Sequence, residues 1–180
     1  MRFHIASPRL YIRPWEDTDR PAFARFVHDP EMVRYLGTGE IGDDPRIDAT
    51  LARQRDTLAK HGCCLGAVVL KESGEVVGLA GIQPLGDTGV FEMGWWIWKD
   101  YWRRGYATEL AFAMRDHAFG VLKLEQIVAI ANVPNQASIR VMQKIGMRYT
   151  GTRSARGLAA RYPDIEVVYY VLENPTKGTP

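Results

Sequence analysis

The sequence has 180 residues, of which 46% are apolar and 24% charged, and its 23 basic and 21 acidic residues give a formal net charge of +2. This length fits a single globular domain, and the balanced charge argues against a nucleic-acid-binding or membrane-surface protein. No run approaches the ~20 apolar residues of a membrane-spanning helix, and the N-terminus, MRFHIASPRL, lacks the apolar core of a signal peptide, so we expect a cytoplasmic protein.

The two cysteines are adjacent in the sequence, at positions 63 and 64. Neighbouring cysteines suit neither an ordinary disulfide nor the Cys-x-x-Cys spacing of a metal site. We therefore expect Cys63 and Cys64 to be two small buried side chains, and no motif in the chain indicates a bound metal.

Apolar periodicity and turn residues predict a mixed α/β (α+β) fold. The predicted elements, in chain order, are a strand at 10–13, a helix from 17 or 18 to about 28, a turn at 37–40, a helix from 44 to about 60, strands at 65–71 and 76–83 that form a hairpin, a strand at 91–98, a helix from 105 to about 120, a strand at 126–131, a helix from 136 to about 145, and strands at 147–151 and 166–172 around a polar loop at 152–164. We expect one domain over residues 1–174, followed by a flexible tail at 175–180. Its sheet of six to seven strands, with about four helices, is antiparallel in the first half and locally parallel around the helix at 105–120.

Residues 92–118, EMGWWIWKDYWRRGYATELAFAMRDHA, are the most informative stretch. An aromatic strand leads into a charged loop, and from Gly105 onward apolar residues recur in steps of three and four, which indicates one face of a helix. The first N–H groups of a helix have no internal partner and favour negative charge. Gly105 lets a ligand approach the backbone closely, and Arg103 and Arg104 add positive charge. This stretch predicts a phosphate-binding turn.

The turn alone does not separate a phosphate site from an ordinary solvated loop. Neither the Gly-x-x-x-x-Gly-Lys-Ser/Thr pattern nor a Gly-x-Gly-x-x-Gly after a strand is present. A phosphate-binding role therefore needs support from another part of the chain.

A second stretch, residues 132–147, places Asn135 where a helix begins and Ser138 in its first turn. Asn135 is a typical N-cap residue, which explains its position without any ligand. The two side chains also lie on neighbouring positions of one side, where both could reach a ligand across the helix N-terminus. Both interpretations stay open at this point.

The two stretches together resemble the GCN5-related N-acetyltransferases (the GNAT family), and the branch most similar is the Rim type, which acetylates N-terminal amines including those of ribosomal proteins. The family turn, Arg/Gln-x-x-Gly-x-Gly/Ala, matches residues 102–107, WRRGYA; Trp102 replaces the opening residue, as is common in the Rim-type branch, and the run GYATE follows. The Asn-x-x-Ala/Ser…Gly-Phe pattern matches Asn135, Ser138, Gly146 and Met147. The opening residues 9–15, RLYIRPW, fit this branch as well.

The resemblance implies a GNAT fold in which two splayed strands form a cleft for acetyl-CoA, the acyl donor. The strand at 91–98 then offers backbone N–H groups near its end to the pantetheine arm, and the pyrophosphate lies on the following turn. The implied coenzyme-binding residues are Ile97, Trp98, Arg103, Arg104, Gly105, Tyr106, Ala107, Thr108, Asn135 and Ser138.

Acetyl transfer also needs a base for the amine and a proton for the departing thiolate. Glu92 is the candidate base, since it is a charged residue in an apolar strand and burial would raise its pKa; an exposed strand glutamate is the alternative. Many relatives carry a tyrosine as general acid at the position of Met142, which cannot donate a proton. The Rim-type resemblance then implies Ser138 as the acid.

The acceptor implied by the resemblance is a primary amine, and a protein N-terminal α-amine fits the branch best. A polyamine, an antibiotic or a metabolite is the alternative, and the acidic residues between Glu40 and Asp44 hint at a cationic acceptor. Tyr35, Glu40, Tyr162 and Asp164 could line the acceptor site. Trp96 and Trp98 lie on the same side of their strand as Glu92, so they could form a wall of that site. The alternative for all of these is ordinary packing or surface exposure.

Two rival functions remain at the level of sequence. A coenzyme-binding module without catalysis would account for Met142. A nucleic-acid-binding domain could use Arg103 and Arg104 with the aromatic residues as a stacking platform, although the near-zero net charge argues against it. A homodimer is compatible with the sequence, which shows no clear interface stripe.

Overall fold

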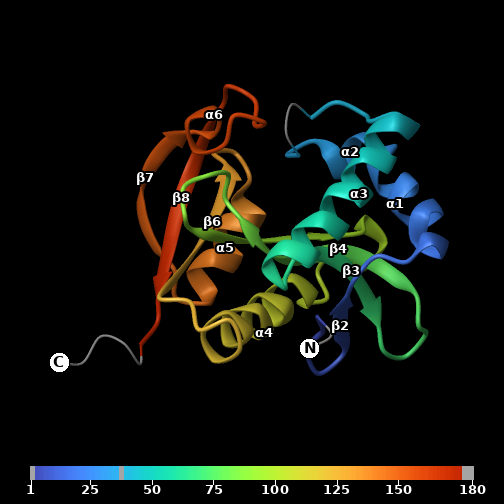
Figure 1. Ribbon diagram of the computed structural model, residues 1–180, viewed down its shortest axis with the longest axis horizontal. Helices are drawn as coiled ribbons and strands as arrows, with labels where there is room; N and C mark the ends of the chain where they lie inside the picture. Colours follow the sequence, from blue (N-terminus) through green and yellow to red (C-terminus); the bar gives the residue numbers. More distant parts are fainter. Residues whose placement is uncertain (1–2, 37–38, 176–180) are drawn as a thin grey trace.

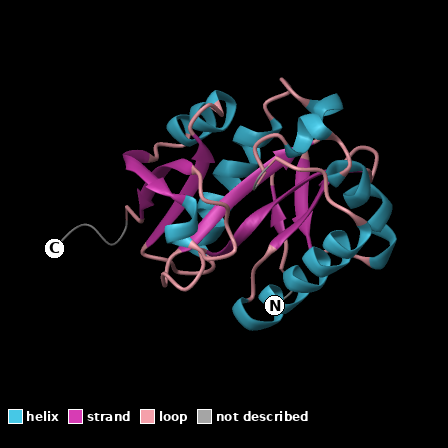
Figure 2. Cartoon of the chain, turned by 90° about the horizontal axis from the view of Figure 1, so that it is seen from above, coloured by secondary structure: helices cyan, strands magenta, loops and turns pink. Residues whose placement is uncertain are grey.

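The computed structural model describes residues 3–36 and 39–175, and within them a mixed sheet of eight strands forms the centre of the molecule. The strand order is β1-β2-β3-β4-β5-β6-β8-β7. The strands are β1 (Ile5–Ala6), β2 (Leu10–Arg13), β3 (Leu65–Leu70), β4 (Val76–Pro84), β5 (Phe91–Ile97), β6 (Gln126–Asn132), β7 (Arg148–Ser154) and β8 (Glu166–Glu173). Seen from above, the strands form a central layer with helices on both sides (Figure 2).

Six α-helices and two short 3-10 turns surround the sheet in the described part of the chain. They are α1 (Arg20–Val27), α2 (Pro30–Val33), α3 (Asp44–His61), α4 (Tyr106–Gly120), α5 (Gln136–Lys144) and α6 (Ala155–Leu158), with η1 (Asp17–Asp19) and η2 (Lys99–Tyr101). In Figure 1, α1, α2 and α3 gather at the upper right, while α4 lies along the bottom of the molecule.

The two faces of the sheet bury separate apolar clusters. One face packs against α4 and α5 around Leu110, Met114 and Met142. The other face packs against α1 and α3 around Phe26 and Ile47. Alternation along a strand explains the division, because successive side chains point to opposite faces. In β3, for example, residues 65 and 67 join the α1–α3 cluster, while residues 68 and 70 join the other.

The sheet divides between β5 and β6. β5 pairs with β4 in antiparallel register along its whole length, from Phe91 opposite Pro84 to Ile97 opposite Gly78. With β6 it forms a parallel pair whose register consists of Glu92 opposite Val128. The two strands therefore diverge after Glu92, and the predicted parallel step around α4 is confirmed.

The structure has every predicted strand and helix and adds three short ones. β1 precedes the first predicted strand, and α2 lies between the first two predicted helices. α6 lies inside the segment expected to be a polar loop, and the first residues of that segment extend β7. Cys63 and Cys64 are buried as expected. The predicted turn at 37–40 and the tail at 175–180 fall partly outside the described residues. None of the described helices has the length and apolar character needed to cross a membrane.

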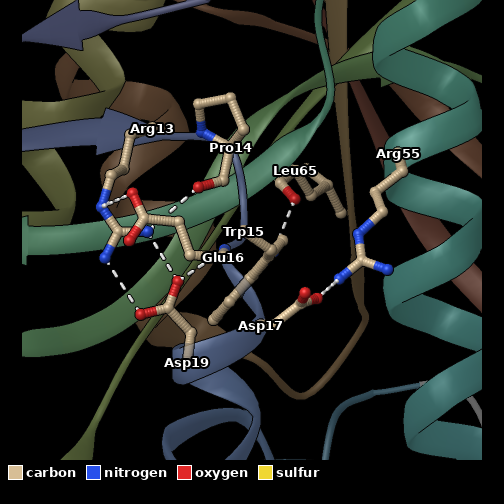
Figure 3. Close-up of polar contacts among 8 residues, drawn as sticks. All are labelled: Arg13, Pro14, Trp15, Glu16, Asp17, Asp19, Arg55 and Leu65. Atoms are coloured by element: carbon tan, nitrogen blue, oxygen red, sulfur yellow. Dashed lines mark hydrogen bonds and ion pairs between the residues drawn. The ribbon is translucent and has the colours of Figure 1, made fainter.

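The segment between β2 and α1 is fixed by polar contacts (Figure 3). Arg13 pairs with Asp19 through two hydrogen bonds of 2.6 and 2.9 Å. Burial by itself would raise the pKa of Asp19, but the Arg13 guanidinium holds it below its ordinary value. The Trp15 indole donates to the Leu65 carbonyl at 2.9 Å. These contacts attach α1 to the sheet, over the face that carries Glu92.

Candidate active site

The divergence of β5 and β6 leaves backbone groups of β5 pointing into the gap. The Trp98 N–H donates to the Val77 carbonyl at 2.8 Å, inside the sheet. Because neighbouring residues of an antiparallel strand direct their N–H groups to opposite sides, those of Trp95 and Ile97 point toward β6. The expectation for Trp98 is therefore wrong: its N–H is already bonded, and its ring stacks on Phe26 with centroids 4.9 Å apart.

A cavity of about 700 Å³, here called the larger cavity, opens between the diverging strands. One wall is the end of β5 with the turn before α4, and the opposite wall is the first part of α5. Eight of the ten predicted coenzyme-binding residues line it: Ile97, Arg103, Gly105, Tyr106, Ala107, Thr108, Asn135 and Ser138.

The turn before α4 leaves the N-terminus of that helix open to the larger cavity. Arg103 and Gly105 both have left-handed backbone conformations, with φ of 62° and 80°. Trp102 fixes the turn to the strand, because its indole N–H donates to the Ile97 carbonyl at 2.6 Å. No side chain of the described residues caps the helix at Gly105. The first N–H groups of α4 can therefore bind a negatively charged ligand.

Arg104 does not reach this cavity with its side chain, contrary to expectation. Its guanidinium lies 5.1 Å from the centre of the Tyr101 ring and donates to the Asp100 carbonyl at 3.2 Å. Its own carbonyl accepts a hydrogen bond of 3.0 Å from Arg9. Arg104 thus shapes the turn, while Arg103 supplies the positive charge that faces the cavity.

Arg9 connects the turn to the first strands. Its guanidinium donates to the Glu109 carboxylate at 2.8 Å and lies 4.5 Å from the centre of the Tyr106 ring. Ser7 donates to the same carboxylate at 2.7 Å. Burial alone would raise the pKa of Glu109, but these hydrogen bonds lower it overall. Glu109 therefore stays ionised and holds the first turn of α4 in place.

The N-terminus of α5 forms the other side of the larger cavity. Asn135 is the N-cap, since its side-chain oxygen accepts from the Ser138 N–H at 3.2 Å. Ser138 is half-buried, and both residues line the cavity. Met142 is fully buried in the core, one turn further along. Arg140 and Lys144 also line the cavity and were not predicted; the available signal was their spacing of four residues, which places two positive charges on one face of α5.

A smaller cavity of about 390 Å³ lies on the other side of the same strands, beneath α1 and α3. It is lined by Glu92, Gln83 and Gln54, by Tyr35 and Glu40, and by Arg161 and Tyr162. The two cavities share lining residues where β5 and β6 diverge: Met93, Gly94, Trp96, Ile130 and Ala131, together with Tyr35. A ligand in one cavity can thus meet a ligand in the other through the gap in the sheet.

Glu92 is 6% exposed and lies at the inner end of the smaller cavity. Its Oε1 accepts from the Gln83 amide at 2.7 Å and from the Tyr162 hydroxyl. Burial raises the pKa of Glu92, and these two hydrogen bonds oppose part of the rise. Among the described residues, both side-chain bonds to Glu92 end on Oε1, so Oε2 is left for a ligand in the cavity.

The hydrogen bonds to Glu92 belong to a longer chain. Gln83 accepts from the Gln54 amide at 3.4 Å, and Gln54 in turn accepts from the Leu65 N–H at 2.9 Å. On the other side, Arg161 donates to the Tyr162 hydroxyl at 3.1 Å. Burial and the neighbouring Glu92 charge raise the pKa of Tyr162, so its hydroxyl remains a proton donor.

Of the other residues expected near the acceptor, Tyr35, Glu40, Tyr162 and Trp96 line the smaller cavity. Asp164 does not line it and instead accepts from the Ser154 hydroxyl at 3.2 Å. Within the described chain, no group of three or more His, Cys, Asp or Glu side chains is arranged to hold a metal ion.

Comparison with known proteins gives one consistent family. The model of the acetyltransferase (GNAT) domain matches residues 9–148. The uncharacterized N-acetyltransferase YnaD of Bacillus subtilis is 28% identical over 148 residues, covering 82% of this chain and 84% of that protein.

Solved structures agree. An acetyltransferase from Agrobacterium tumefaciens superposes with a TM-score of 0.78 at 28% identity, covering 96% of this chain and 95% of the other. Mycobacterium smegmatis RimJ, in complex with CoA-disulfide, superposes with a TM-score of 0.75 over 99% of this chain and 89% of its own; at 19% identity it shows the shared fold.

The chain belongs to the GNAT acetyltransferase family, as its match to the family model over most of its length shows. It is an acetyltransferase, and its acyl donor is acetyl-CoA. The expected splayed-sheet fold is confirmed.

Proposed function

We propose that this enzyme transfers the acetyl group to the N-terminal α-amine of a protein or peptide, as the resemblance to the Rim-type branch implies. The observation that carries the proposal is the pair of cavities that meet at the gap between β5 and β6. One contains an open helix N-terminus, and the other ends at a buried carboxylate. This arrangement suits a reaction in which two substrates enter from opposite sides.

The larger cavity fits the coenzyme. The first N–H groups of α4, at Tyr106, Ala107 and Thr108, suit its pyrophosphate, because they lack internal partners and lie at the positive end of the helix dipole. The N–H groups of Trp95 and Ile97 suit the amide groups of its pantetheine arm. Arg103, Arg140 and Lys144 supply positive charge along the remaining wall.

The smaller cavity fits the acceptor, with the amine next to Glu92. An α-amine has a pKa of about 8, so roughly a tenth of it is neutral at pH 7, whereas a lysine amine at about 10.4 is almost fully charged. A carboxylate with a raised pKa is a stronger base than an ordinary one. Glu92 can therefore accept the proton that the α-amine loses when its nitrogen bonds to the acetyl carbon.

The departing sulfur needs a proton when its bond to that carbon breaks. Ser138 is our candidate donor, because it lines the larger cavity and Met142 has no proton to give. Its hydroxyl is the group at the start of α5 that can both donate a proton and recover one from water. Asn135 positions Ser138 by binding its backbone N–H.

The direct test is a measurement of thiol release from acetyl-CoA with three kinds of acceptor: short peptides with free N-termini, the same peptides with blocked N-termini and a free lysine, and small polyamines. We expect turnover with the free N-termini, and mass spectrometry should place the added acetyl group on the first residue. Turnover confined to polyamines or to lysine side chains would overturn the proposal.

A further inference from the structure

Three arginines line the smaller cavity. Arg46 and Arg53 come from α3, and Arg161 comes from the segment after α6. The two on α3 are seven residues apart, which is two helical turns, so they lie on one face about 10 Å apart along the axis. Ala49 and Thr50, between them on that face, also line the cavity.

These arginines lack carboxylate partners among the ion pairs of the described residues, unlike the other arginines nearby. Arg20 pairs with Asp44 and Asp48, and Arg25 pairs with Asp100. By contrast, Arg161 donates its side-chain hydrogen bond to the neutral Tyr162 hydroxyl, and it lies near enough to Glu92 for its charge to lower the pKa of that carboxyl, without forming an ion pair with it.

The three charges also influence one another. The protein atoms packed around Arg53, and then the positive charges of Arg161 and Arg46, lower the pKa of Arg53. Repulsion between like charges around one cavity raises the free energy of the folded protein, and a bound anion would offset this repulsion.

The carboxylates that line the cavity do not balance this charge. Among the described residues they are Glu40 and Glu92, two negative charges against three positive ones even when Glu92 is ionised. The acidity expected near residues 40–44 is used elsewhere: Asp43 accepts from the Arg46 N–H at the start of α3, and Asp44 pairs with Arg20. The hint of a cationic acceptor is therefore not supported by the charges around the cavity.

We infer that the acceptor carries a carboxylate close to its reactive amine, as a peptide does with Asp or Glu in the residues after the first. This inference rests on the proposed function. The amine lies against Glu92 at the inner end, and the acidic side chain lies between Arg46, Arg53 and Arg161. Arginine suits this role because its guanidinium donates two parallel hydrogen bonds to a carboxylate.

The test compares three peptides that share one sequence except at positions 2 and 3, where they carry Asp, Asn or Lys. We expect kcat/KM for the Asp peptide to exceed that of the Asn peptide by roughly tenfold at low salt, and the Lys peptide to be poorest. Added salt should reduce the ratio. In the double variant Arg46→Gln, Arg53→Gln the Asp and Asn peptides should become equivalent, mainly through KM.

The matched control is Arg55→Gln, which removes the same charge from the same helix. Arg55 points toward Asp17 of η1 and pairs with it (Figure 3), and it does not line the cavity. The control should keep the preference for Asp. Equal use of the Asp and Asn peptides by the unaltered enzyme, or a preference that survives loss of Arg46 and Arg53, would overturn the inference while leaving peptide acetylation intact.

Two further measurements separate this inference from the proposed function. If no peptide is acetylated, the same comparison is made with free glutamate and glutamine. An arginine-dependent preference for glutamate would then support the inference and reject the peptide acceptor. Calorimetry in the presence of CoA gives the dissociation constants of the Asp and Asn peptides without any turnover. Tighter, arginine-dependent binding of the Asp peptide supports the inference, and equal binding overturns it.

Discussion

Glu92 is a carboxylate buried within an apolar strand, where its charge is costly and its basicity is increased. Burial makes the ionised form less stable and raises the pKa, while Gln83 and Tyr162 offset part of this cost by hydrogen bonding. A carboxyl group held in this way can remove a proton from an amine more readily than a solvated one.

Replacing Glu92 with Gln should lower kcat by on the order of 100-fold near pH 7, which is typical for loss of a general base. The deficit should shrink toward pH 9, because the α-amine is then neutral without assistance. The measurement is the pH dependence of kcat for both enzymes with one peptide at saturating acetyl-CoA. A ratio that stays constant across this range would exclude Glu92 as the base.

Tyr162→Phe should move the acidic limb of the kcat/KM profile to higher pH. The Tyr162 hydroxyl stabilises ionised Glu92, so its removal raises the pKa of Glu92 further. Glu92 acts as a base when ionised, so activity is then lost at a higher pH as the solution is acidified. Tyr149→Phe on the exposed β7 edge is the control and should leave the limb unchanged. A shift of the limb toward lower pH would contradict the role of the Tyr162 hydrogen bond in stabilising ionised Glu92.

At the scale of single elements, the start of α5 combines a structural and a chemical role. Asn135 caps the helix, and Ser138, one turn later, faces the larger cavity. Each role has its own measurable consequence, because the first concerns folding and the second concerns turnover.

Ser138→Ala should reduce kcat at least tenfold while leaving the affinity for CoA within about a factor of two, if Ser138 supplies the proton to the thiolate. Asn135→Ala should instead cost about 1 kcal/mol of stability through loss of the cap. Calorimetric binding and thermal unfolding separate the two effects. An equal fall in CoA affinity and kcat for Ser138→Ala would reduce Ser138 to a binding contact.

The turn before α4 depends on a residue distant in sequence. Arg9→Ala removes the hydrogen bonds to Glu109 and to the Arg104 carbonyl, so we expect a several-fold rise in KM for acetyl-CoA and a loss of roughly 1 kcal/mol in stability. Arg115→Ala, on the exposed side of α4, is the control for removing an arginine. An unchanged KM would show that the turn holds its shape without Arg9.

The elements with long periodic patterns could be predicted from the sequence, and the shortest could not. β1 has two residues, and α2 and α6 have four each, which is too short for a period of two or 3.6 to be recognised. The turn before α4 and the start of α5 were recognised in the sequence because glycine, at position 105, and asparagine, at position 135, are residue types that a tight turn and a helix N-cap favour.

The contacts across the site depend on register, which one sequence does not specify. Gln83 lies opposite Glu92 in the β4–β5 pair, and this position could be recognised once the hairpin was aligned. The error at Trp98 has the same origin, since its N–H points into the sheet or out of it according to that register. Tyr162 reaches Glu92 from 70 residues further along the chain, and no local pattern indicates that contact.

At the scale of the whole molecule, the larger cavity separates two parts of one sheet. One part contains β1 to β5 and the other contains β6, β8 and β7. Because the walls of the cavity come from both parts, a ligand that fills it connects them.

CoA should therefore raise the unfolding temperature of the protein. At a concentration of about 100 times its dissociation constant, a ligand that binds only the folded state contributes about 2.7 kcal/mol. For a chain of this length we expect a shift of several degrees in calorimetry. Adenosine alone, which lacks the pantetheine arm and the pyrophosphate, should give a much smaller shift. Equal shifts would show that the cavity does not bind the coenzyme along its length.

The two adjacent cysteines have a practical consequence for enzymology. Cys63 and Cys64 are 0% and 1% exposed, and burial raises the pKa of the Cys63 thiol to about 11 and that of Cys64 to about 12. Disulfide dyes that count free sulfhydryl groups react with thiolates, so the folded enzyme should contribute almost no background colour. A slow rise in colour without acceptor and without acetyl-CoA would then report unfolding of the enzyme itself.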